Sequence, residues 1–479
     1  MGEAAVAAAE VGTEETAVKM ARALKVCGRV LVWGAGFLLV AVLLWFAANR
    51  FLDERPDPRR EAFLLPGTGV PDEENLAVGI AGLGAPSGAD FMKFGSEVRK
   101  LHESYADWHE IERNVHGLGE LKLTVESEQI RCWIDPDWEG WKGFKECLPF
   151  DKAPRVLADN RELLDRYKRL YRLERHVAFG FREVDLMSFA KLAVAEMRLD
   201  MRARRYEAAY AKWRDHFRFT RNYLRGQNGW IGKSIGMVDL AFNLQLLEDL
   251  LVMRPSLSHV HYAELLELLR PRGIGLIEPD ALARAQYVDL ERYLRTPYAR
   301  DPELSDTLDW LGWKLGQEHR ILNRYLAYSM DYGNVLRLSW TEMPGTFSKL
   351  RERYVTLGWN DLIDPFGAIL LLRQIHWQLK LTSTLRQVYI EDGRLRLASL
   401  VVRIVSGHVA DEQIPHFLLE APTELNDPFS GKSMRWDAKY GRLYFVTSDD
   451  GCEIAPFRVP AWNTAGKRRA PKPADWWIC

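Results

Sequence analysis

Apolar and polar positions follow a helical period over most of the chain. Between residues 151 and 270, apolar side chains recur every three or four positions, which is the spacing of one buried face on a helix. The helices expected in this stretch span residues 160–173, 184–203, 205–224, 230–253 and 261–269. Neighbouring members would form helical hairpins of a repeat-like kind, although no fixed period of about 34 residues is present.

This pattern breaks at residues 271–275, resumes, and changes near the C-terminus. Further helices are expected at residues 91–116, 279–294, 306–331 and 366–406, with a less regular stretch at 342–364. After Pro415, the composition favours short strands at 416–420, 433–437 and 442–447. We therefore expect a mainly α fold with a small antiparallel β-hairpin element at residues 411–460.

The most apolar stretch is GRVLVWGAGFLLVAVLLWFAA at residues 28–48, where Arg29 is the single charged side chain. A helix rises roughly 1.5 Å per residue, so this stretch can cross the roughly 30 Å hydrocarbon core of a bilayer. A buried core helix would normally be shorter and would show a polar stripe. A cleaved signal peptide would normally have a shorter apolar region and fewer residues before it. We expect a transmembrane helix here, with the lipid bilayer as its partner.

The remaining segments follow from this assignment. Residues 1–27 would form a cytoplasmic N-terminus, and residues 49–74, which contain four prolines, would form an extended linker. Residues 75–410 would form the helical domain. Residues 461–479 are basic and contain prolines, so we expect a partly disordered tail.

Cysteine spacing decides the expected orientation, because basic residues are balanced on the two sides of the span. Cys132 and Cys147 flank a loop-like segment, RCWIDPDWEGWKGFKEC, that suits a local structural disulfide. Such bonds persist in oxidising compartments. We therefore expect a single-pass protein of the bacterial inner membrane whose C-terminal domain lies in the periplasm. The state of Cys452 and Cys479 stays open.

The same loop also resembles a calcium-binding loop in its spacing. DPDWEGWKGFKE has acidic residues at positions 1, 3, 5 and 12 and a glycine at position 6, as in an EF-hand. The candidate ligands are Asp135, Asp137, Glu139 and Glu146. Lys142 stands where a small apolar residue is usual, and the flanks lack clear helical patterns. A solvated loop closed by the disulfide is the favoured interpretation, calcium is the alternative, and we expect no cofactor.

Nucleotide and nucleic-acid binding are both disfavoured. Two Gly-Lys-Ser tripeptides, at 232–234 and 431–433, resemble the end of a phosphate-binding loop. That loop needs a glycine five positions before its second glycine, where this chain has Gln227 and Asn426. The 65 basic residues are balanced by 66 acidic residues, so the chain has no overall attraction for polyanions. We expect neither nucleotide nor nucleic acid as a partner.

The stretch NDPFSGKSMRW reads as a turn before a hairpin. Asp427, Pro428 and Gly431 are residue types that favour turns, and Gly451 would end the second strand. These four residues form the expected hairpin signature.

This C-terminal run resembles a segment of uncharacterised proteobacterial single-pass membrane proteins, in which a helix leads to a DPFSGKPLRY-like turn. It is also locally similar to the C-terminus of type II secretion major pseudopilins, where a DPWGNPY-like turn precedes LYSLGADG. The chain departs from pseudopilins because no prepilin cleavage site precedes its span. It also has no counterpart of their calcium site at residues 452–455. The resemblance implies a shared helix-plus-hairpin element and a membrane context, and it implies no activity.

The sequence contains no HExxH or CxxC pattern. We therefore expect a non-enzymatic interaction or scaffold protein that binds another envelope protein. The alternatives are an envelope hydrolase with a site built from distant histidines and carboxylates, and a calcium-binding module at residues 135–146.

Overall fold

The computed structural model of the 479-residue chain describes most of the helical domain and only parts of the N-terminal region. The described residues are 25, 28–29, 32–45, 47, 53–64, 69–103, 122–126, 129–133, 148–177, 186–226, 229–295, 317–355, 368, 371–372, 375, 382–446 and 457–460. The predicted tail at 461–479 lies outside these ranges, as does nearly all of the predicted segment 1–27.

The described part of the chain is mainly helical. Its α-helices are α2 (Arg59–Leu64), α3 (Leu76–Gly82), α4 (Phe91–Glu103), α6 (Ala153–Asp159), α7 (Arg161–Arg169), α8 (Leu186–Arg202), α9 (Tyr206–Arg225), α10 (Trp230–Met253), α11 (Leu257–Val260), α12 (Tyr262–Leu268), α13 (Pro279–Arg295), α15 (Glu318–Leu336), α16 (Met343–Val355), α18 (Thr382–Ser406) and α19 (Ile414–Glu420). The expected mainly α fold is confirmed at this level.

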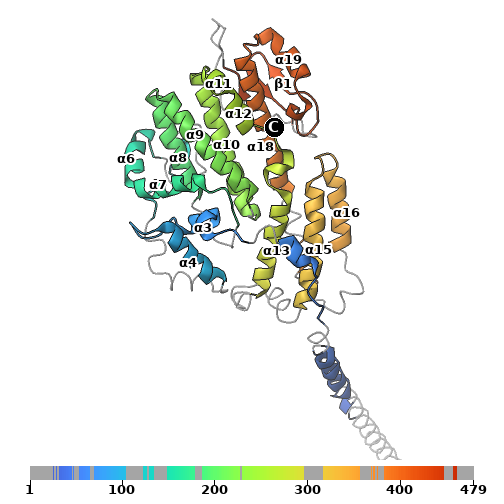
Figure 1. Cartoon of the computed structure of the whole chain (residues 1–479). Helices are drawn as coiled ribbons and strands as arrows, with labels where there is room; N and C mark the ends of the chain where they lie inside the picture. The colour runs from blue at the N-terminus through green and yellow to red at the C-terminus, as the bar shows by residue number, and fades with distance from the viewer. Residues whose placement is uncertain are drawn as a thin grey trace, which may run out of the picture.

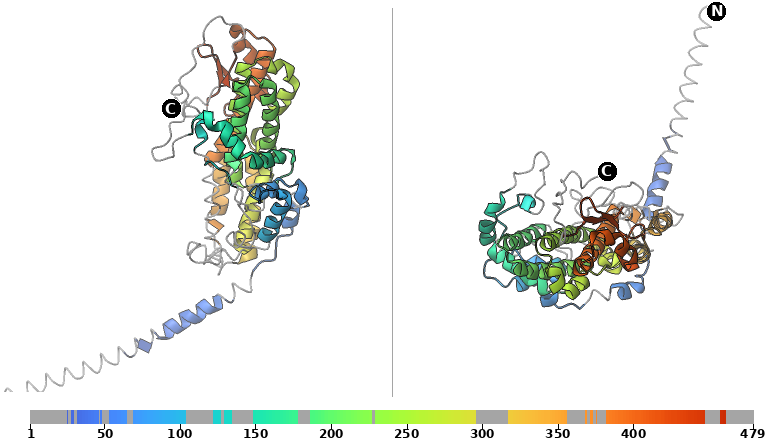
Figure 2. Two further views of the ribbon diagram at one scale, coloured as in Figure 1. Left: turned by 90° about the vertical axis from the view of Figure 1, so that its left-hand side faces the viewer. Right: turned by 90° about the horizontal axis from the view of Figure 1, so that it is seen from above.

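Helices α8, α9, α10 and α18 form the centre of the helical body (Figures 1 and 2). On α9, the rings of Tyr210, Trp213 and Phe217 recur every three or four positions, and all three are buried. Each large apolar side chain contributes about 1.5–3 kcal/mol when it is removed from water. On α10, buried leucines such as Leu240 and Leu244 complete the same core.

A second group consists of α13, α15 and α16 (Figure 1). The rings of Tyr287, Tyr325, Tyr328 and Tyr332 follow one another with centroid separations of 6.3, 5.8 and 5.6 Å. Helix α16 lies within the stretch 342–364, which the sequence pattern presented as less regular. Its apolar residues still meet the core, because Phe347 and Leu350 lie on one face and are buried.

A small antiparallel sheet lies near the C-terminus, as expected. Its strands are β1 (Arg435–Asp437), β2 (Arg442–Tyr444) and β3 (Phe457–Arg458), in the order β1-β2-β3. The third strand was not expected. The strand expected at 416–420 is wrong, because these residues belong to helix α19. Pro415 occupies the first turn of that helix, and Ile414 and Leu418 bury one face at helical spacing.

Residues 53–64, within the segment 49–74 that the sequence indicated as an extended linker, include helix α2 and contact the body. Asp53 lies at the N-terminus of α15, where its carboxylate accepts hydrogen bonds from the backbone amides of His319 (3.1 Å) and Arg320 (3.1 Å). Arg60 forms a bidentate ion pair with Glu291 of α13, at 2.6 and 2.8 Å. Residues 53–64 are therefore docked on the body.

The predicted span at 28–48 is helical wherever it is described. Its large apolar side chains are exposed, for example Trp33 at 78% and Phe37 at 77%. No helix in the described part of the chain is both long and apolar enough to cross a membrane. Residues 28–48 are described only at 28–29, 32–45 and 47, so the span itself stays a prediction.

Candidate functional site

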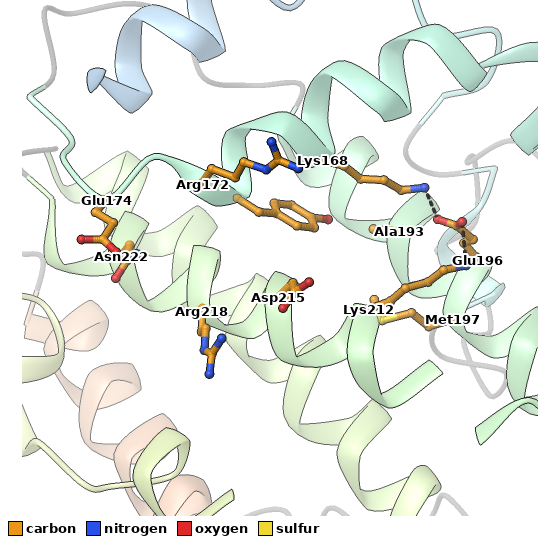
Figure 3. A pocket seen from close by; sticks show the side chains of 11 residues that line it. Lys168, Arg172, Glu174, Ala193, Glu196, Met197, Lys212, Asp215, Arg218 and Asn222 are labelled. Atoms are coloured by element: carbon orange, nitrogen blue, oxygen red, sulfur yellow. Dashed lines mark hydrogen bonds and ion pairs between the residues drawn. The ribbon is translucent and has the colours of Figure 1, made fainter. Parts of the chain in front are cut away.

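A polar hollow of about 430 Å³ opens beside α8, α9 and the 3-10 turn η5 (Leu170–Arg172), as Figure 3 shows. Its basic side chains are Lys168, Arg172, Lys212 and Arg218. Its acidic side chains are Glu174, Glu196 and Asp215. Ala193 and Met197 on α8 add an apolar wall. The volume falls within the range of roughly 300–1,000 Å³ that is common for small-molecule sites.

One end of the hollow is closed by paired charges. Lys168 and Lys212 both contact the Glu196 carboxylate, at 2.7 and 2.8 Å. Lys212 also lies 2.8 Å from Asp200, which is one helical turn after Glu196 on α8. Burial would raise the pKa of Glu196, but the two ammonium groups outweigh it and hold that pKa below its usual value. This end of the hollow is internally neutralised.

The other end of the hollow has side chains with unused hydrogen-bonding capacity. Tyr171, Arg172, Glu174 and Asn222 make no side-chain hydrogen bond or ion pair among the described residues. Figure 3 shows Glu174 and Asn222 together, away from Lys168 and its partners. A polar ligand could therefore bind these groups without breaking a contact within the protein.

A buried polar network lies beneath Tyr171. The ring of Tyr171 packs on the imidazole of His216, with 5.4 Å between the centroids. His216 Nε2 is 3.1 Å from the Tyr167 hydroxyl and 3.4 Å from Asp239 Oδ2. The Thr220 hydroxyl donates a hydrogen bond of 2.5 Å to the same carboxylate oxygen. This network joins η5, α9 and α10 through polar side chains.

Burial favours the neutral form of both titrating groups in this network. It lowers the pKa of His216, although the Asp239 carboxylate and the Asn243 side chain act in the opposite direction. It raises the pKa of Asp239 despite His216 and Thr220. His216 is 0% exposed, so its imidazole cannot contact a molecule in the hollow. In this conformation, the network supports the floor of the hollow and does not line it.

Cys132 is the one cysteine, of five in the chain, that lies in the described part. Its Sγ lies 3.5 Å from the carbonyl oxygen of Leu148. No disulfide joins two described cysteines, and Cys147 lies outside the described residues. The structure does place Leu148, the next residue along the chain, beside Cys132. The pairing of Cys132 with Cys147 nevertheless stays a prediction.

The four candidate calcium ligands lie outside the described residues. They are Asp135, Asp137, Glu139 and Glu146. Elsewhere, the residues that the structure describes include no group of three or more histidine, cysteine or acidic side chains placed to hold a metal ion. Calcium binding at residues 135–146 therefore remains an untested alternative.

The Gly-Lys-Ser tripeptide at 431–433 lies in a tight turn organised by Asp427. The Asp427 carboxylate accepts hydrogen bonds from the Phe429 amide (2.9 Å) and from the Ser430 hydroxyl (2.6 Å). Gly431 has a φ of +68°, which suits glycine in a turn. Pro428 lies within the same turn, and Gly451 lies outside the described residues.

The other Gly-Lys-Ser tripeptide lies within helix α10. Lys233 is buried there, and its ammonium group donates hydrogen bonds to the backbone oxygens of Leu224 and Gly226 at the end of α9. A lysine near a helix C-terminus interacts favourably with the unpaired carbonyl groups and with the helix dipole. Its position supports a structural role.

The hollow was not anticipated from the sequence. Its side chains come from residues 168–174, 193–197 and 212–222, which meet only when η5, α8 and α9 pack together. The one local signal was the pair Glu196 and Asp200, which are four residues apart on one helix face and opposite Lys212.

No protein-family model, curated protein or solved structure matches this chain.

Proposed function

We propose that the chain is a single-pass protein of the bacterial inner membrane whose helical domain binds another envelope protein in the periplasm. The observation that carries this proposal is the apolar helical segment 32–45, whose large side chains are exposed. Exposed apolar surface of this extent is costly in water and is characteristic of a membrane or protein contact. The lipid bilayer is the partner that suits its length and its apolar surface on several sides.

The arrangement of the helices supports an interaction domain. Helices α8, α9 and α10 follow one another in sequence and pack as neighbours, which is the geometry of successive helical hairpins. Repeat-like hairpins build extended surfaces that commonly bind proteins. We propose the same role here.

A binding surface for this partner is available at the end of the body far from residues 32–45 (Figure 1). A groove of about 640 Å³ separates α11 and α12 from α19 and the end of α18. Val260, which is 68% exposed, and Leu419, which is 74% exposed, directly follow or precede the lining residues His259 and Glu420 in the chain, although neither lines the groove itself. Isolated apolar residues on a surface need no explanation, but two beside a groove favour a protein contact.

The experiment has two parts, both on the full-length chain in membranes. Reporter fusions at each terminus should place the C-terminal reporter outside the cytoplasm, and membrane fractionation should retain the chain. A C-terminal reporter that is active only in the cytoplasm would overturn the topology and the periplasmic location together.

The second part identifies the partner by crosslinking and quantifies its capture. Leu419→Asp and Val260→Asp should each reduce capture of the same partner about tenfold or more, because each places a charge in an apolar contact. Ile231→Asp is the matched control, since Ile231 is 69% exposed on α10 and neither it nor its neighbours in the chain line the groove. Equal capture by all three variants would refute this surface.

A hydrolase is the second candidate, and the His216–Asp239 pair beneath the hollow is the observation that favours it. Catalysis would require Tyr171 to move so that a substrate reached His216. Hydrolysis of a chromogenic ester by the full-length chain, lost in His216→Gln and retained in His416→Gln, would favour the enzyme. Equal rates in all three proteins would refute a role for His216.

A further inference from the structure

We propose that the polar hollow beside α8 and α9 binds a small zwitterion, which carries both an ammonium and a carboxylate group. An α-amino acid or a short peptide with free ends has this chemistry. The inference concerns a different surface from the groove assigned to the protein partner, so it does not depend on that assignment.

The carboxylate of the ligand would pair with Arg172. Its guanidinium has no ion pair or hydrogen bond among the described residues, although it borders a hollow that also contains acidic groups. A guanidinium binds a carboxylate through two parallel hydrogen bonds, which gives both affinity and orientation. The remaining basic groups are already used, since Arg218 pairs with Glu264 at 2.9 Å and Lys212 pairs with Glu196 and Asp200.

The ammonium of the ligand would pair with Asp215 across the hollow or with Glu174, two residues after Arg172. Asp215 uses one oxygen to contact Arg214 at 2.9 Å, which leaves the other oxygen available. Glu174 is exposed and has no partner among the described residues. Figure 3 shows Arg172 and Asp215 on opposite sides of the hollow. The two ends of a zwitterion would therefore each meet the opposite charge.

Neutral groups complete the site. The Tyr171 hydroxyl and the Asn222 amide border the hollow and have unused hydrogen-bonding capacity. Burial and the Asp239 carboxylate raise the pKa of Tyr171 well above its usual value, so its hydroxyl keeps its proton and can donate. Ala193 and Met197 offer an apolar wall for the carbon chain of the ligand.

The balance of charge favours a zwitterion over a simple ion. An inorganic anion would meet Glu174 and Asp215 as well as Arg172, and like charges oppose binding. A polyamine would meet Arg172 and Arg218 in the same way. A molecule with both charges satisfies the free basic and acidic groups of the hollow together.

The test is equilibrium dialysis of the full-length chain in detergent micelles. One pool contains the common free L-amino acids, and a second contains their glycyl dipeptides. Mass spectrometry identifies any retained compound, and calorimetric titration then gives its affinity. Retention from the first pool identifies an amino acid, and retention from the second identifies a short peptide. Retention from neither pool would overturn the proposal.

Capped ligands and variants test the assigned contacts. N-acetylation or C-amidation of the retained compound should each weaken binding about tenfold or more, because each removes one charge–charge contact. Arg172→Gln and Asp215→Asn should cause similar losses. Arg175→Gln and Asp165→Asn change nearby exposed residues outside the hollow and should leave affinity unchanged. Equal affinity for capped and free forms would overturn the proposal.

These variants also separate this proposal from the proposed function. Arg172 is exposed, so Arg172→Gln should fold normally, which far-UV circular dichroism can confirm. Arg172→Gln should lose the zwitterion and still capture the envelope partner through the groove. Loss of partner capture together with loss of the zwitterion would show that the hollow belongs to the partner's site, and would overturn a separate small-molecule site.

Discussion

Buried polar residues determine how the centre of this molecule responds to pH. His216 and Asp239 lie 3.4 Å apart in a core otherwise formed by aromatic and aliphatic side chains. A charge that leaves water loses solvation, and a single opposite charge recovers only part of that loss. Because the pKa of His216 is lowered and that of Asp239 is raised, the folded state favours neutral forms on both residues.

Acidification should therefore destabilise the protein through His216. Below its usual pKa of 6.5, the unfolded chain takes up a proton at this histidine before the folded chain does, so the free energy of unfolding falls as pH decreases. The loss is at most about 1.4 kcal/mol per pH unit. The raised pKa of Asp239 contributes a gain in stability on acidification, so the test is the difference between proteins: from pH 7.5 to pH 5, the change in the free energy of urea unfolding should be more negative in the wild type than in His216→Gln. His416→Gln, at an exposed histidine, is the control and should behave like the wild type.

The Glu196 carboxylate should also make the stability of the protein depend on pH, through its ion pairs with two lysines. Its pKa is lowered, so its stabilising effect is present above the ordinary carboxyl pKa of 4.5 and is lost as pH falls through the lowered value. Glu196→Gln should cost about 1–2 kcal/mol at pH 7, because Lys168 and Lys212 lose a shared carboxylate. Asp159→Asn removes an exposed ion pair with Arg155 and should change stability by less than about 0.5 kcal/mol. Equal losses of unfolding free energy in Glu196→Gln and Asp159→Asn would contradict the expectation that the more buried ion pair contributes more to stability.

At the scale of elements, the α3–α4 pair shows how glycine sets the distance between helices. A Cβ atom added to Gly82 would lie 1.8 Å from the Phe91 carbonyl oxygen, and one added to Gly95 would lie 2.0 Å from the Val78 carbonyl oxygen. Neither contact can be relieved by a side-chain rotation, because both involve backbone atoms. The two helices can therefore approach this closely only with glycine at these positions.

Gly95→Ala should consequently destabilise the protein by about 2–3 kcal/mol, since α4 must move away from α3. Gly345→Ala on α16 is a matched control, because a Cβ atom there meets no atom within 4 Å. Alanine is favoured over glycine in a helix by about 0.5–1 kcal/mol, so the control should be neutral or stabilising. Thermal unfolding of both variants gives the comparison. A loss of stability in both would point to a general intolerance of substitution.

The elements that the sequence predicted well are those with long, regular apolar spacing. Helix α10 begins and ends where the pattern indicated, at residues 230 and 253, because its apolar residues extend over many turns. Helix α19 was mistaken for a strand because a run of five residues, 416–420, is too short to separate the two periods. Helix α16 was missed because Pro344 and Gly345 in its first turn are poor helix formers, and tertiary burial of Phe347 overrides that preference.

At the scale of the whole molecule, contacts between distant segments were beyond prediction. The polar hollow needs η5, α8 and α9 to be placed together, and the docking of residues 53–64 needs α13 and α15. From the sequence, Arg172 and Asp53 would both be interpreted as ordinary solvated surface residues. The elements that lie beside each of them are known only from the fold. The turn at Asp427 was predictable from the sequence, because the hydrogen-bond partners of its carboxylate, at 429 and 430, lie two and three residues further along the chain.

The docking of residues 53–64 determines where the chain first contacts the helical body after the proposed membrane span. Asp53 accepts hydrogen bonds at the N-terminus of α15, which has no capping side chain at its own N-cap residue, Gln317. The negative charge of Asp53 also interacts favourably with the positive end of the α15 dipole. Contacts between the chain and the helical body therefore begin at Asp53, eight residues after the helical segment 32–45.

Removal of this cap should release the segment. Asp53→Ala deletes two backbone hydrogen bonds and a contact of 2.9 Å with His319, so local opening should become easier by about 2 kcal/mol. When opening is fast, proteolysis follows the population of the open form, so trypsin should cleave after Arg59 and Arg60 about tenfold or more faster than in the wild type. Mass spectrometry of early fragments identifies these cuts.

Asp72→Ala is the control for this last prediction. Asp72 pairs with Arg99 at 2.7 Å in a comparable half-buried contact, but it joins the 3-10 turn η2 (Asp72–Glu74) to α4. Its loss should leave cleavage after Arg59 and Arg60 unchanged. Identical cleavage rates in Asp53→Ala and the wild type would mean that Arg60 and Glu291 hold the segment by themselves, and Glu291→Gln would then accelerate the same cuts. If Asp53→Ala and Glu291→Gln are both cleaved as slowly as the wild type, the proposed attachment is contradicted. Neither set of contacts would then be holding residues 53–64 against the body.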